Sequence, residues 1–586
     1  MKEEALLYLE TEEFIYPVSR KCLCVRFRAA KEDLARCSVI FYDRTDRSKQ
    51  RYGILERKYR DRLFDYYSAR VSFPKIARYQ KYYFCLEDTD HEIRYLGRSG
   101  LQKEPPVEDC FEYLYTNETD VVTTPSWAEG MVCYQIFPER FCNGDPSNDP
   151  EGTQVWGSPP TRENYCGGDL KGIREKIPYL KDLGIDCIYI NPIFKGDFNH
   201  KYATTDYFAI DPSFGTEQDL KDLTDAAHRV GIRTLLDGVF NHTGVHFAPF
   251  EDLLEHQESS QYRDWFHVPS FPLRVSHHSY ECVGAYKWMP KLNTANPEVR
   301  SFVIRVMTYW IEHCGIDGWR LDVADEVDGC LWREARYELK RRYPDVFLVG
   351  ETWGYGGRLL RGDQLDSVMN YLFRDAVAAF IGKRTIPPSE FDARLNHMLA
   401  LYKEENDRVL YNLIGSHDTE RFLTLCGGNR ARLKLAAAFQ MTFPGIPAIY
   451  YGDEAGLAGE NDPGCRGCMN WEDPDRDLTE WYRRLIRLRH EMPELQKGSF
   501  HSWIADDERQ IYGFTRRTPE SICYVLFHLG QAEHTVPCPV EEEGIYRNTL
   551  GREIYLTERG KTGYRIHVLL EPDSVKVITN KEEKDK

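Results

Sequence analysis

The sequence predicts an α/β protein built on a (β/α)8 (TIM) barrel, with an inserted loop domain, an N-terminal β-sandwich and a C-terminal β-sandwich. From Val132 onward, short apolar runs alternate with segments of helical period, as in β/α units. Acidic residues directly follow several of these runs, and functional groups at the carboxyl ends of strands are typical of barrels. Both ends of the chain show β alternation instead. Spacing alone leaves a doubly wound sheet open as an alternative.

The N-terminal residues 1–122 alternate apolar and polar side chains in the β manner. Strand-like runs at Val25–Arg28, Val39–Tyr42 and Tyr79–Cys85 are separated by charged stretches, without a long helical period. We therefore expect a β-sandwich, followed by a polar linker. The chain returns to the same pattern at 498–586, where we expect the C-terminal β-domain.

The barrel is predicted over residues 123–242 and 293–497. The segment 243–292 interrupts it and shows no clear β/α unit. We assign this segment to an inserted domain B, because a long insertion after a barrel strand is usually functional.

Helix-end signals support the predicted barrel helices. Residues 170–183 have an apolar helical face that ends at Gly184, and Pro178 is expected to kink that helix. Thr216 with Asp219 resembles a capping box at the start of the next helix.

The composition limits which classes of partner we expect the protein to bind and in which compartment we expect it. The net charge of −17 argues against nucleic acid and anionic membranes, which are themselves negative. We see no signal peptide and no bilayer-spanning run, so we expect a cytoplasmic protein. The odd count of 17 cysteines fits a reduced compartment better than a disulfide framework. Cys465 and Cys468 form a single CxxC without further ligands, so we do not expect it to have a metal or redox role.

Three carboxylates follow short strand-like runs: Asp322, Glu351 and Asp418. If these runs are barrel strands, the acids meet at one rim. A retaining glycosidase needs two carboxylates about 5 Å apart, one as nucleophile and one as general acid. Arg320 lies two residues before Asp322, on the same side of the strand, and we expect its charge to hold the pKa of Asp322 down.

Four ordered motifs resemble those of the α-amylase family (glycoside hydrolase family 13). They are Asp237-Gly238-Val239-Phe240-Asn241-His242, Gly318-Trp319-Arg320-Leu321-Asp322, Glu351-Thr352-Trp353 and Ser416-His417-Asp418. A further motif of the neopullulanase, cyclomaltodextrinase and maltogenic amylase subgroup is similar to Met289-Pro290-Lys291-Leu292-Asn293. The resemblance covers about residues 125–500, and the flanking β-domains match the subgroup in position and pattern only.

This resemblance implies a retaining hydrolase of α-1,4 glucosidic bonds, with α-1,6 bonds as an open further target. Its substrates would be cyclodextrins, maltodextrins or pullulan, with some transglycosylation. Asp322 is implied to be the nucleophile, Glu351 the acid/base and Asp418 the transition-state stabiliser. Asp237 is implied to brace the site. The implied substrate-binding residues are His200, Tyr202, His242, Arg320, Trp353, His417, Asp462 and Arg466.

A loop rich in oxygen donors is a candidate structural Ca²⁺ site. The subgroup has a calcium site at positions that match Asn143, Asp145, Asn148, Asp149, Gly167 and Asp169. A polar turn without a metal is the alternative. The resemblance implies no catalytic cofactor.

The resemblance also bears on specificity and assembly. Asp325 stands where the subgroup often has Asn, and Ala203 stands where Asp is frequent, so both bear on fine specificity. The N-terminal domain is implied to be of the carbohydrate-binding and dimerisation type. We therefore expect a homodimer whose ligands are α-glucan oligosaccharides.

Three alternatives stay open. The first is an ordinary α-amylase or oligo-1,6-glucosidase of the same family. The second is a carbohydrate-binding or scaffold protein built on an inactive barrel. Such proteins lose catalytic acids, whereas this sequence keeps all three. The third is a barrel metallohydrolase that uses Asp237, His242 and His246, which would be sensitive to a chelator and indifferent to Glu351→Gln.

Overall fold

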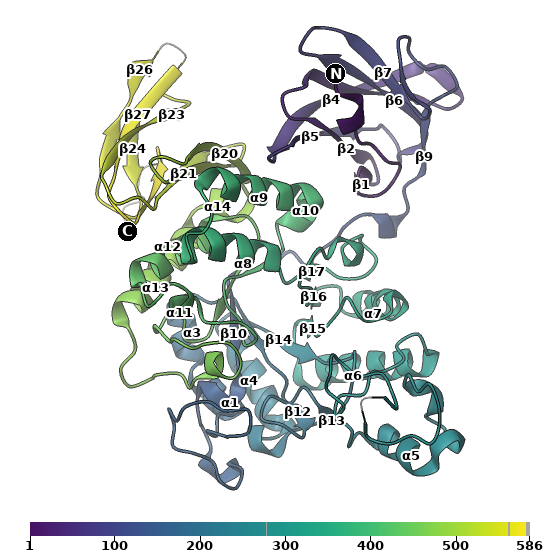
Figure 1. The fold of residues 1–586 in the computed structure, drawn as a ribbon, viewed down its shortest axis with the longest axis vertical. Helices are drawn as coiled ribbons and strands as arrows, with labels where there is room; N and C mark the ends of the chain where they lie inside the picture. Colours follow the sequence, from purple (N-terminus) through teal and green to yellow (C-terminus); the bar gives the residue numbers. More distant parts are fainter. Residues whose placement is uncertain (277, 561–562, 582–586) are drawn as a thin grey trace.

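The computed structural model describes residues 1–276, 278–560 and 563–581. A central barrel carries a β-domain at each end of the chain, and both β-domains lie toward the same end of the long axis (Figure 1). None of the helices in the described residues has the length and apolar character that crossing a bilayer requires.

Nine antiparallel strands form the N-terminal domain. The 15-residue β4 pairs with β3 along its first part and with β5 along its last part, so the strands fold into two layers. Phe27 and Phe84 meet between the layers with ring centroids 5.0 Å apart. The strands are β1 (Ile15–Ser19), β2 (Cys22–Ala30), β3 (Leu34–Asp43), β4 (Asp46–Arg60), β5 (Phe64–Ser72), β6 (Arg78–Asp88), β7 (Ile93–Gly97), β8 (Gly100–Gln102) and β9 (Phe111–Tyr115).

Eight parallel strands form the barrel, in the order β17-β16-β15-β14-β11-β10-β19-β18. A parallel bridge between Met369 and Tyr411 joins the two end strands and closes the ring. This confirms the predicted (β/α)8 barrel and excludes the doubly wound sheet. The strands are β10 (Cys133–Ile136), β11 (Cys187–Ile190), β14 (Arg233–Gly238), β15 (Gly318–Leu321), β16 (Phe347–Gly350), β17 (Ser367–Val368), β18 (Tyr411–Leu413) and β19 (Ile446–Tyr450).

Helices alternate with these strands and cover the outside of the ring (Figure 1). They include α1 (Pro138–Phe141), α2 (Leu170–Glu175), α3 (Ile177–Leu183), α4 (Glu217–Arg229), α6 (Pro297–Cys314), α7 (Gly329–Arg342), α8 (Tyr371–Val377), α9 (Pro388–Leu401), α10 (Glu404–Asp407), α11 (Phe422–Leu425), α12 (Arg430–Thr442), α13 (Arg476–Glu491) and α14 (Pro493–Lys497).

The helix-end signals are largely confirmed. Thr216 and Asp219 form the predicted capping box at α4. Gly184, with φ of 97°, ends α3. The one expected kinked helix is instead two, α2 and α3, which meet at Lys176, because Pro178 is favourable in a first turn but not in a helix interior.

The segment 243–292 packs over one side of the barrel rim. It contains α5 (Ala248–His256), and its two ends meet where the Thr243 N–H donates to the Pro290 carbonyl at 3.0 Å. A separate hairpin, β12 (Phe194–Gly196) with β13 (Thr204–Ile210), follows β11. Both extensions leave from carboxyl ends of barrel strands, where the site is expected.

The C-terminal domain consists of two sheets, with the orders β20-β21-β22-β28-β24-β25 and β23-β27-β26. Fully buried side chains from both sheets, such as Leu526 and Val568, form its core. The strands are β20 (Ser499–Asp506), β21 (Ile511–Arg517), β22 (Ile522–His528), β23 (His534–Val540), β24 (Ile545–Asn548), β25 (Ile554–Leu556), β26 (Glu558–Gly560), β27 (Gly563–Leu570) and β28 (Ser574–Thr579).

Candidate active site

The three predicted acids lie beyond the carboxyl ends of barrel strands. Asp322 directly follows β15, Glu351 directly follows β16, and Asp418 lies in the loop after β18. All three line one cleft with a volume of about 570 Å³. Seven of the eight predicted substrate-binding residues line the same cleft, namely His200, Tyr202, His242, Trp353, His417, Asp462 and Arg466.

The eighth, Arg320, lies beneath the cleft and joins the acids. Its side chain is 1% exposed, with Nη1 2.8 Å from Oδ1 of Asp322 and Nη2 3.0 Å from Oε2 of Glu351. Because one planar guanidinium contacts both carboxylates, the two acids face the same small volume. This is the close pairing that a retaining glycosidase requires.

Asp237, in β14, braces this arrangement from below. It is 2% exposed and accepts hydrogen bonds from the Tyr202 hydroxyl at 2.9 Å, from Nη1 of Arg320 at 2.9 Å and from the Tyr189 hydroxyl. These contacts hold both the arginine and Tyr202, which lines the cleft, in fixed positions.

His417 is held in one orientation by its neighbours. Its Nε2 lies 2.7 Å from the Tyr202 hydroxyl, and the two rings are nearly parallel at 4°. Its Nδ1 lies 2.9 Å from Nε2 of Gln135 and 3.2 Å from Nδ2 of Asn191, both buried. Burial, together with the nearby Arg466 charge, lowers the pKa of His417 well below its usual range, so the imidazole is neutral.

Arg466 joins Asp418, Asp462 and the His417 backbone on one wall of the cleft. Its Nη2 lies 3.3 Å from Oδ1 of Asp418, its Nη1 lies 2.9 Å from Oδ1 of Asp462, and its Nε donates to the His417 carbonyl at 2.9 Å. The predicted residues of this wall therefore form one connected group.

Aromatic rings frame the open side of the cleft. Trp353 is 54% exposed, stacks on Tyr371 at 4.1 Å, and donates from Nε1 to Oε1 of Glu351 at 3.2 Å. On another wall Phe198 stacks on His200 at 5.2 Å and lies 6.0 Å from Trp288. Such faces suit the apolar sides of sugar rings.

The comparisons with known proteins agree with this geometry. The model of the α-amylase catalytic domain matches residues 135–485, and the model of the α-amylase N-terminal Ig-like domain matches residues 1–117. This chain belongs to the α-amylase family.

Relatives match nearly the whole chain. Neopullulanase 2 of Thermoactinomyces vulgaris is 44% identical over 92% of this chain and 93% of its own length. The intracellular maltogenic amylase of Bacillus subtilis is 37% identical over 91% of this chain and 92% of its own length. A solved cyclomaltodextrinase structure superposes with a TM-score of 0.93, at 37% identity, over 99% of this chain and all of that chain.

One expectation about the site of this α-amylase family chain is wrong. Arg320 was expected to hold the pKa of Asp322 down, but burial raises that pKa well above its usual range. Arg320 acts in the expected direction and only partly offsets the burial, while the charges of Glu351 and Asp237 add to the rise. Burial is thus the main cause, and the two further carboxylates around the one guanidinium add to it.

Several residues of the site were missed from the sequence. Gln135 and Asn191 lie at ends of barrel strands, and polar residues there were the available signal. Phe198, Tyr286 and Trp288 also line the cleft, and aromatic enrichment beside Met289 was the signal for the last two.

The residue after Asp322 is strained. Val323 has φ of 45°, a region that β-branched residues rarely occupy, and its N–H donates to Oε2 of Glu351 at 2.9 Å. Strain of this kind clusters at functional sites. Here it directs a backbone donor at the predicted acid/base.

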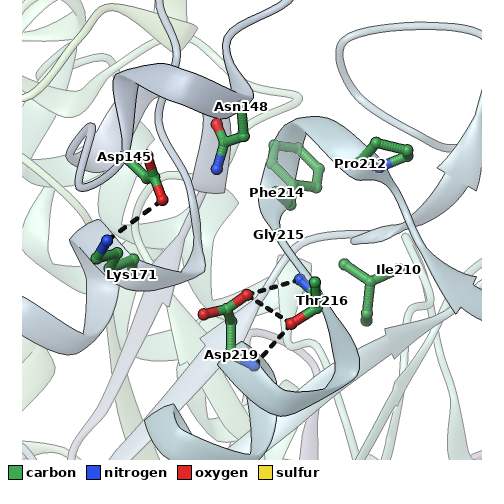
Figure 2. Close-up of a pocket in the computed structure, with 9 residues that line it drawn as sticks. All are labelled: Asp145, Asn148, Lys171, Ile210, Pro212, Phe214, Gly215, Thr216 and Asp219. Atoms are coloured by element: carbon green, nitrogen blue, oxygen red, sulfur yellow. Dashed lines mark hydrogen bonds and ion pairs between the residues drawn. The ribbon is translucent and has the colours of Figure 1, made fainter.

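The six residues predicted for calcium lie together in one loop region. Asn143 Nδ2 donates to Oδ1 of Asp149 at 2.9 Å, and a Cβ on Gly167 would lie 2.3 Å from the same oxygen. Asn148 Nδ2 donates to Oδ2 of Asp169 at 3.1 Å. Figure 2 shows Asp145 in the same region, paired with Lys171 at 3.2 Å across a pocket from Thr216.

Some oxygen atoms of this loop accept several hydrogen bonds, and others accept none. Asp169 also accepts from the N–H groups of Gly144, Asp145 and Gly172. The Oδ1 atoms of Asn143 and Asn148 are buried and have no hydrogen-bond partner. Within the described residues no group of three or more His, Cys, Asp or Glu side chains is placed to hold a metal ion. Amide and backbone oxygens would therefore have to complete a site here.

The residues of the metallohydrolase alternative do not form a ligand group among the described residues. Asp237 binds Arg320 and two tyrosines, and His246 pairs at 3.1 Å with Glu251. The structure therefore does not favour that alternative.

A variant that lacks the His242 imidazole should lose less stability in acid than the wild type. Its imidazole is 2% exposed, and burial lowers its pKa to about 3. Below pH of about 6.5 the unfolded histidine binds a proton that the folded one does not, so stability falls as pH falls from about 6.5 toward 3. By pH 5 this single group costs about 2 kcal/mol.

Urea unfolding at pH 7.5 and at pH 5 measures the effect. His242→Gln should reduce the stability difference between the two pH values by about 2 kcal/mol. His246→Gln, at an exposed histidine, is the control and should leave the difference unchanged. An unchanged difference in His242→Gln would contradict the neutral, buried state.

Proposed function

We propose that this chain is a retaining glycoside hydrolase that cleaves α-1,4 glucosidic bonds of cyclodextrins, maltodextrins or pullulan, with some transglycosylation. The observation that carries the proposal is the shared contact of Asp322 and Glu351 with one buried guanidinium at the barrel rim. The similarity to a neopullulanase and to a cyclomaltodextrinase structure favours this substrate class over that of an ordinary α-amylase.

In the first step Asp322 acts as the nucleophile and Glu351 as the general acid. The Asp322 carboxylate attacks the anomeric carbon while Glu351 donates its proton to the leaving oxygen, which forms a covalent glycosyl-enzyme. Glu351 then accepts a proton from water, which attacks the same carbon and restores the original configuration. Arg320 orients both carboxylates, so each step uses groups already in place.

The other residues of the cleft bind the sugar. Asp418 would hold ring hydroxyls and favour the distorted, cation-like transition state. His417 and His242, both buried and neutral, would hydrogen-bond the sugar at the cleavage point. Tyr202 would stack on that ring, and Asp462 and Arg466 would hold the glycone side. Trp353 would stack on the leaving-group side.

A side-by-side product profile tests the substrate class. β-Cyclodextrin and short maltodextrins should be consumed faster than starch, with the α-anomer released first. Faster hydrolysis of starch than of cyclodextrin would favour the ordinary α-amylase, and cleavage of α-1,6 bonds alone would favour the oligo-1,6-glucosidase. Release of the β-anomer first would contradict a retaining mechanism.

We also infer a homodimer in a cytoplasmic compartment. Tyr52 and Ile54 of β4 are 68% and 59% exposed on the same side of the strand, which supports contact between N-terminal domains. All 17 cysteines are free thiols, and the B. subtilis relative is named as intracellular. Light scattering that shows only monomer at micromolar concentration would contradict the dimer.

We propose that the loop around Asn143 holds a structural Ca²⁺. The free Oδ1 atoms of Asn143 and Asn148 fit a hard cation that prefers oxygen ligands, and Asp149 with the Gly167 backbone lies beside them. Asp145 and Asp169 would contribute charge and brace the loop through the hydrogen bonds they already make.

Removing calcium should lower thermal stability. With free ion at about 100 times its dissociation constant, binding contributes about 2.7 kcal/mol, and a chelator should remove this contribution. Melting curves with a chelator and after added Ca²⁺ measure the shift. Asp149→Ala should abolish the response, whereas Asp473→Ala, at an exposed aspartate outside the loop, should keep it. A wild-type melting curve that ignores the chelator would contradict the site.

A further inference from the structure

A firmly held turn presents an arginine to the cleft. In the turn 161–164, Oδ1 of Asn164 accepts from the Thr161 N–H at 2.7 Å, and the Asn164 N–H donates to the Thr161 hydroxyl at 3.0 Å. Nη2 of the buried Arg140 donates to the carbonyl and to Oδ1 of Asn164, at 2.7 and 2.9 Å. Because these bonds fix both ends of the turn, the backbone of Arg162 is held in place, and its side chain lines the cleft.

The same turn is tied to the segment that carries Phe198. Nδ2 of Asn199, which is 5% exposed, donates to the Asn164 carbonyl at 2.9 Å. Phe198 directly precedes Asn199, is half-buried and lines the same cleft as Arg162. Two hydrogen-bonded segments thus supply an aromatic face and a group of N–H donors, which suit the apolar face and the hydroxyl groups of a sugar ring.

Arg162 also extends a row of charged side chains along the cleft. Arg466 contacts Oδ1 of Asp418 and Oδ1 of Asp462, at 3.3 and 2.9 Å. Nε of Arg162 lies 3.6 Å from Oδ2 of Asp462, the other oxygen of that carboxylate. Arg162 is therefore at the end of the row that is farther from Asp418, which is proposed to hold the sugar at the cleavage point.

The ion pair with Asp462 does not account for Arg162. The arginine side chain is 67% exposed, and 3.6 Å is too long for a hydrogen bond. Exposed ion pairs of this kind contribute little to stability. Among the described residues it is the only ion pair or hydrogen bond of this side chain. A guanidinium carries five N–H donors in a planar fork, so most of them remain free for hydroxyl groups of a ligand in the cleft.

We propose that Arg162 is a specificity-determining residue, which binds a glucose unit of the glycone beyond the unit at the cleavage point. Its guanidinium donates to neighbouring hydroxyl groups of the glycone, and Phe198 supplies an apolar face on the same side of the cleft. This inference rests on the proposed function, which assigns Asp462 and Arg466 to the glycone side. Substrates with two or more glucose units in the glycone should therefore gain from Arg162, and those with one unit should not.

A series of glycosyl fluorides tests the assignment, because α-glucosyl, α-maltosyl and α-maltotriosyl fluoride share a leaving group and differ only in the glycone. In Arg162→Ala, kcat/KM should be unchanged on α-glucosyl fluoride and should fall about tenfold on α-maltotriosyl fluoride, through the loss of hydrogen bonds from a charged donor. The shortest fluoride that shows the loss identifies the unit that Arg162 binds. Arg229→Ala, at an exposed arginine outside the cleft, is the control and should match the wild type on all three. Equal losses on all three fluorides, or no loss on any, would overturn the proposal.

A double variant distinguishes contact with the sugar from positioning of Asp462. When Arg162→Ala is added to Asp462→Asn, kcat/KM on α-maltotriosyl fluoride should fall further, because the guanidinium donates to the sugar directly. If the addition causes no further loss, Arg162 acts only through Asp462, and direct binding is overturned.

Equilibrium binding separates this inference from the proposed function. Asp322→Asn should not turn over the fluorides, so calorimetry on this variant measures their dissociation constants. In Asp322→Asn/Arg162→Ala the constant for α-maltotriosyl fluoride should rise about tenfold, and that for α-glucosyl fluoride should not change. An unchanged constant for α-maltotriosyl fluoride would overturn the role of Arg162 even where catalysis is as proposed. If the wild type hydrolyses none of the fluorides, the proposed function fails, and the binding result still decides the role of Arg162.

Discussion

Asp322→Asn is expected to lower kcat on cyclodextrins and maltodextrins by about 10⁴-fold or more, as removal of a nucleophile does in other enzymes with covalent intermediates. An amide does not form the covalent glycosyl-enzyme, so the first chemical step is lost. Asparagine has nearly the same shape and keeps an oxygen that faces Nη1 of Arg320. The substitution should therefore remove turnover and leave the barrel intact.

Initial rates on β-cyclodextrin, together with circular dichroism and a melting curve, measure both parts of this expectation. The melting temperature should not fall, because the carboxylate is buried at a cost that the amide does not have. Asp473→Asn is the matched control, since Asp473 is exposed and does not line the cleft. That variant should keep wild-type turnover. Residual rates within about tenfold of wild type in Asp322→Asn would remove the proposed mechanism.

Glu351→Gln is expected to lower kcat/KM on maltodextrins by roughly 10³-fold, within the range of about 10² to 10⁴ that general acid–base catalysis contributes. The glutamine fills the same space beside Trp353 and Val323 but has no proton to donate to the leaving oxygen. The loss of activity in Glu351→Gln should therefore be larger for leaving groups that must be protonated before they depart.

An activated substrate makes this expectation specific. Fluoride leaves without protonation, so Glu351→Gln should release fluoride from α-maltosyl fluoride in the first turnover with a far smaller loss, whereas Asp322→Asn should fail on both substrates. Glu163→Gln is the control, because Glu163 also lines the cleft and has no proposed role in proton transfer. Equal losses in first-turnover release of fluoride and in cleavage of maltodextrins would contradict the role of Glu351 as the acid.

The sequence predicted those features that depend on short-range pattern. The apolar runs before Asp322 and Glu351 mark strands, and acids after strands of a barrel meet at one rim whatever the helices do. The capping box at Thr216 was visible for the same reason, since it needs only residues three apart. The identity of the family came from motifs, and the comparisons confirm it.

Features that depend on tertiary packing were not predictable. The pKa of Asp322 is set by burial and by two further carboxylates, and neither is readable from Arg320 two residues away. Phe198 faces the cleft, but most aromatic residues of the chain fill cores, so composition does not distinguish it.

The single guanidinium of Arg320 beneath the cleft leaves the site negatively charged, which favours the transition state over the ground state of the substrate. Asp237, Asp322 and Glu351 together outnumber the one positive charge of Arg320, and a surplus negative charge remains even with one of the three protonated. A neutral glucan gains little from this field, whereas the oxocarbenium-like species formed on the way to products carries developing positive charge. The cleft is thus already polarised for the ion that appears in mid-reaction, and no dipoles need to reorganise when it does.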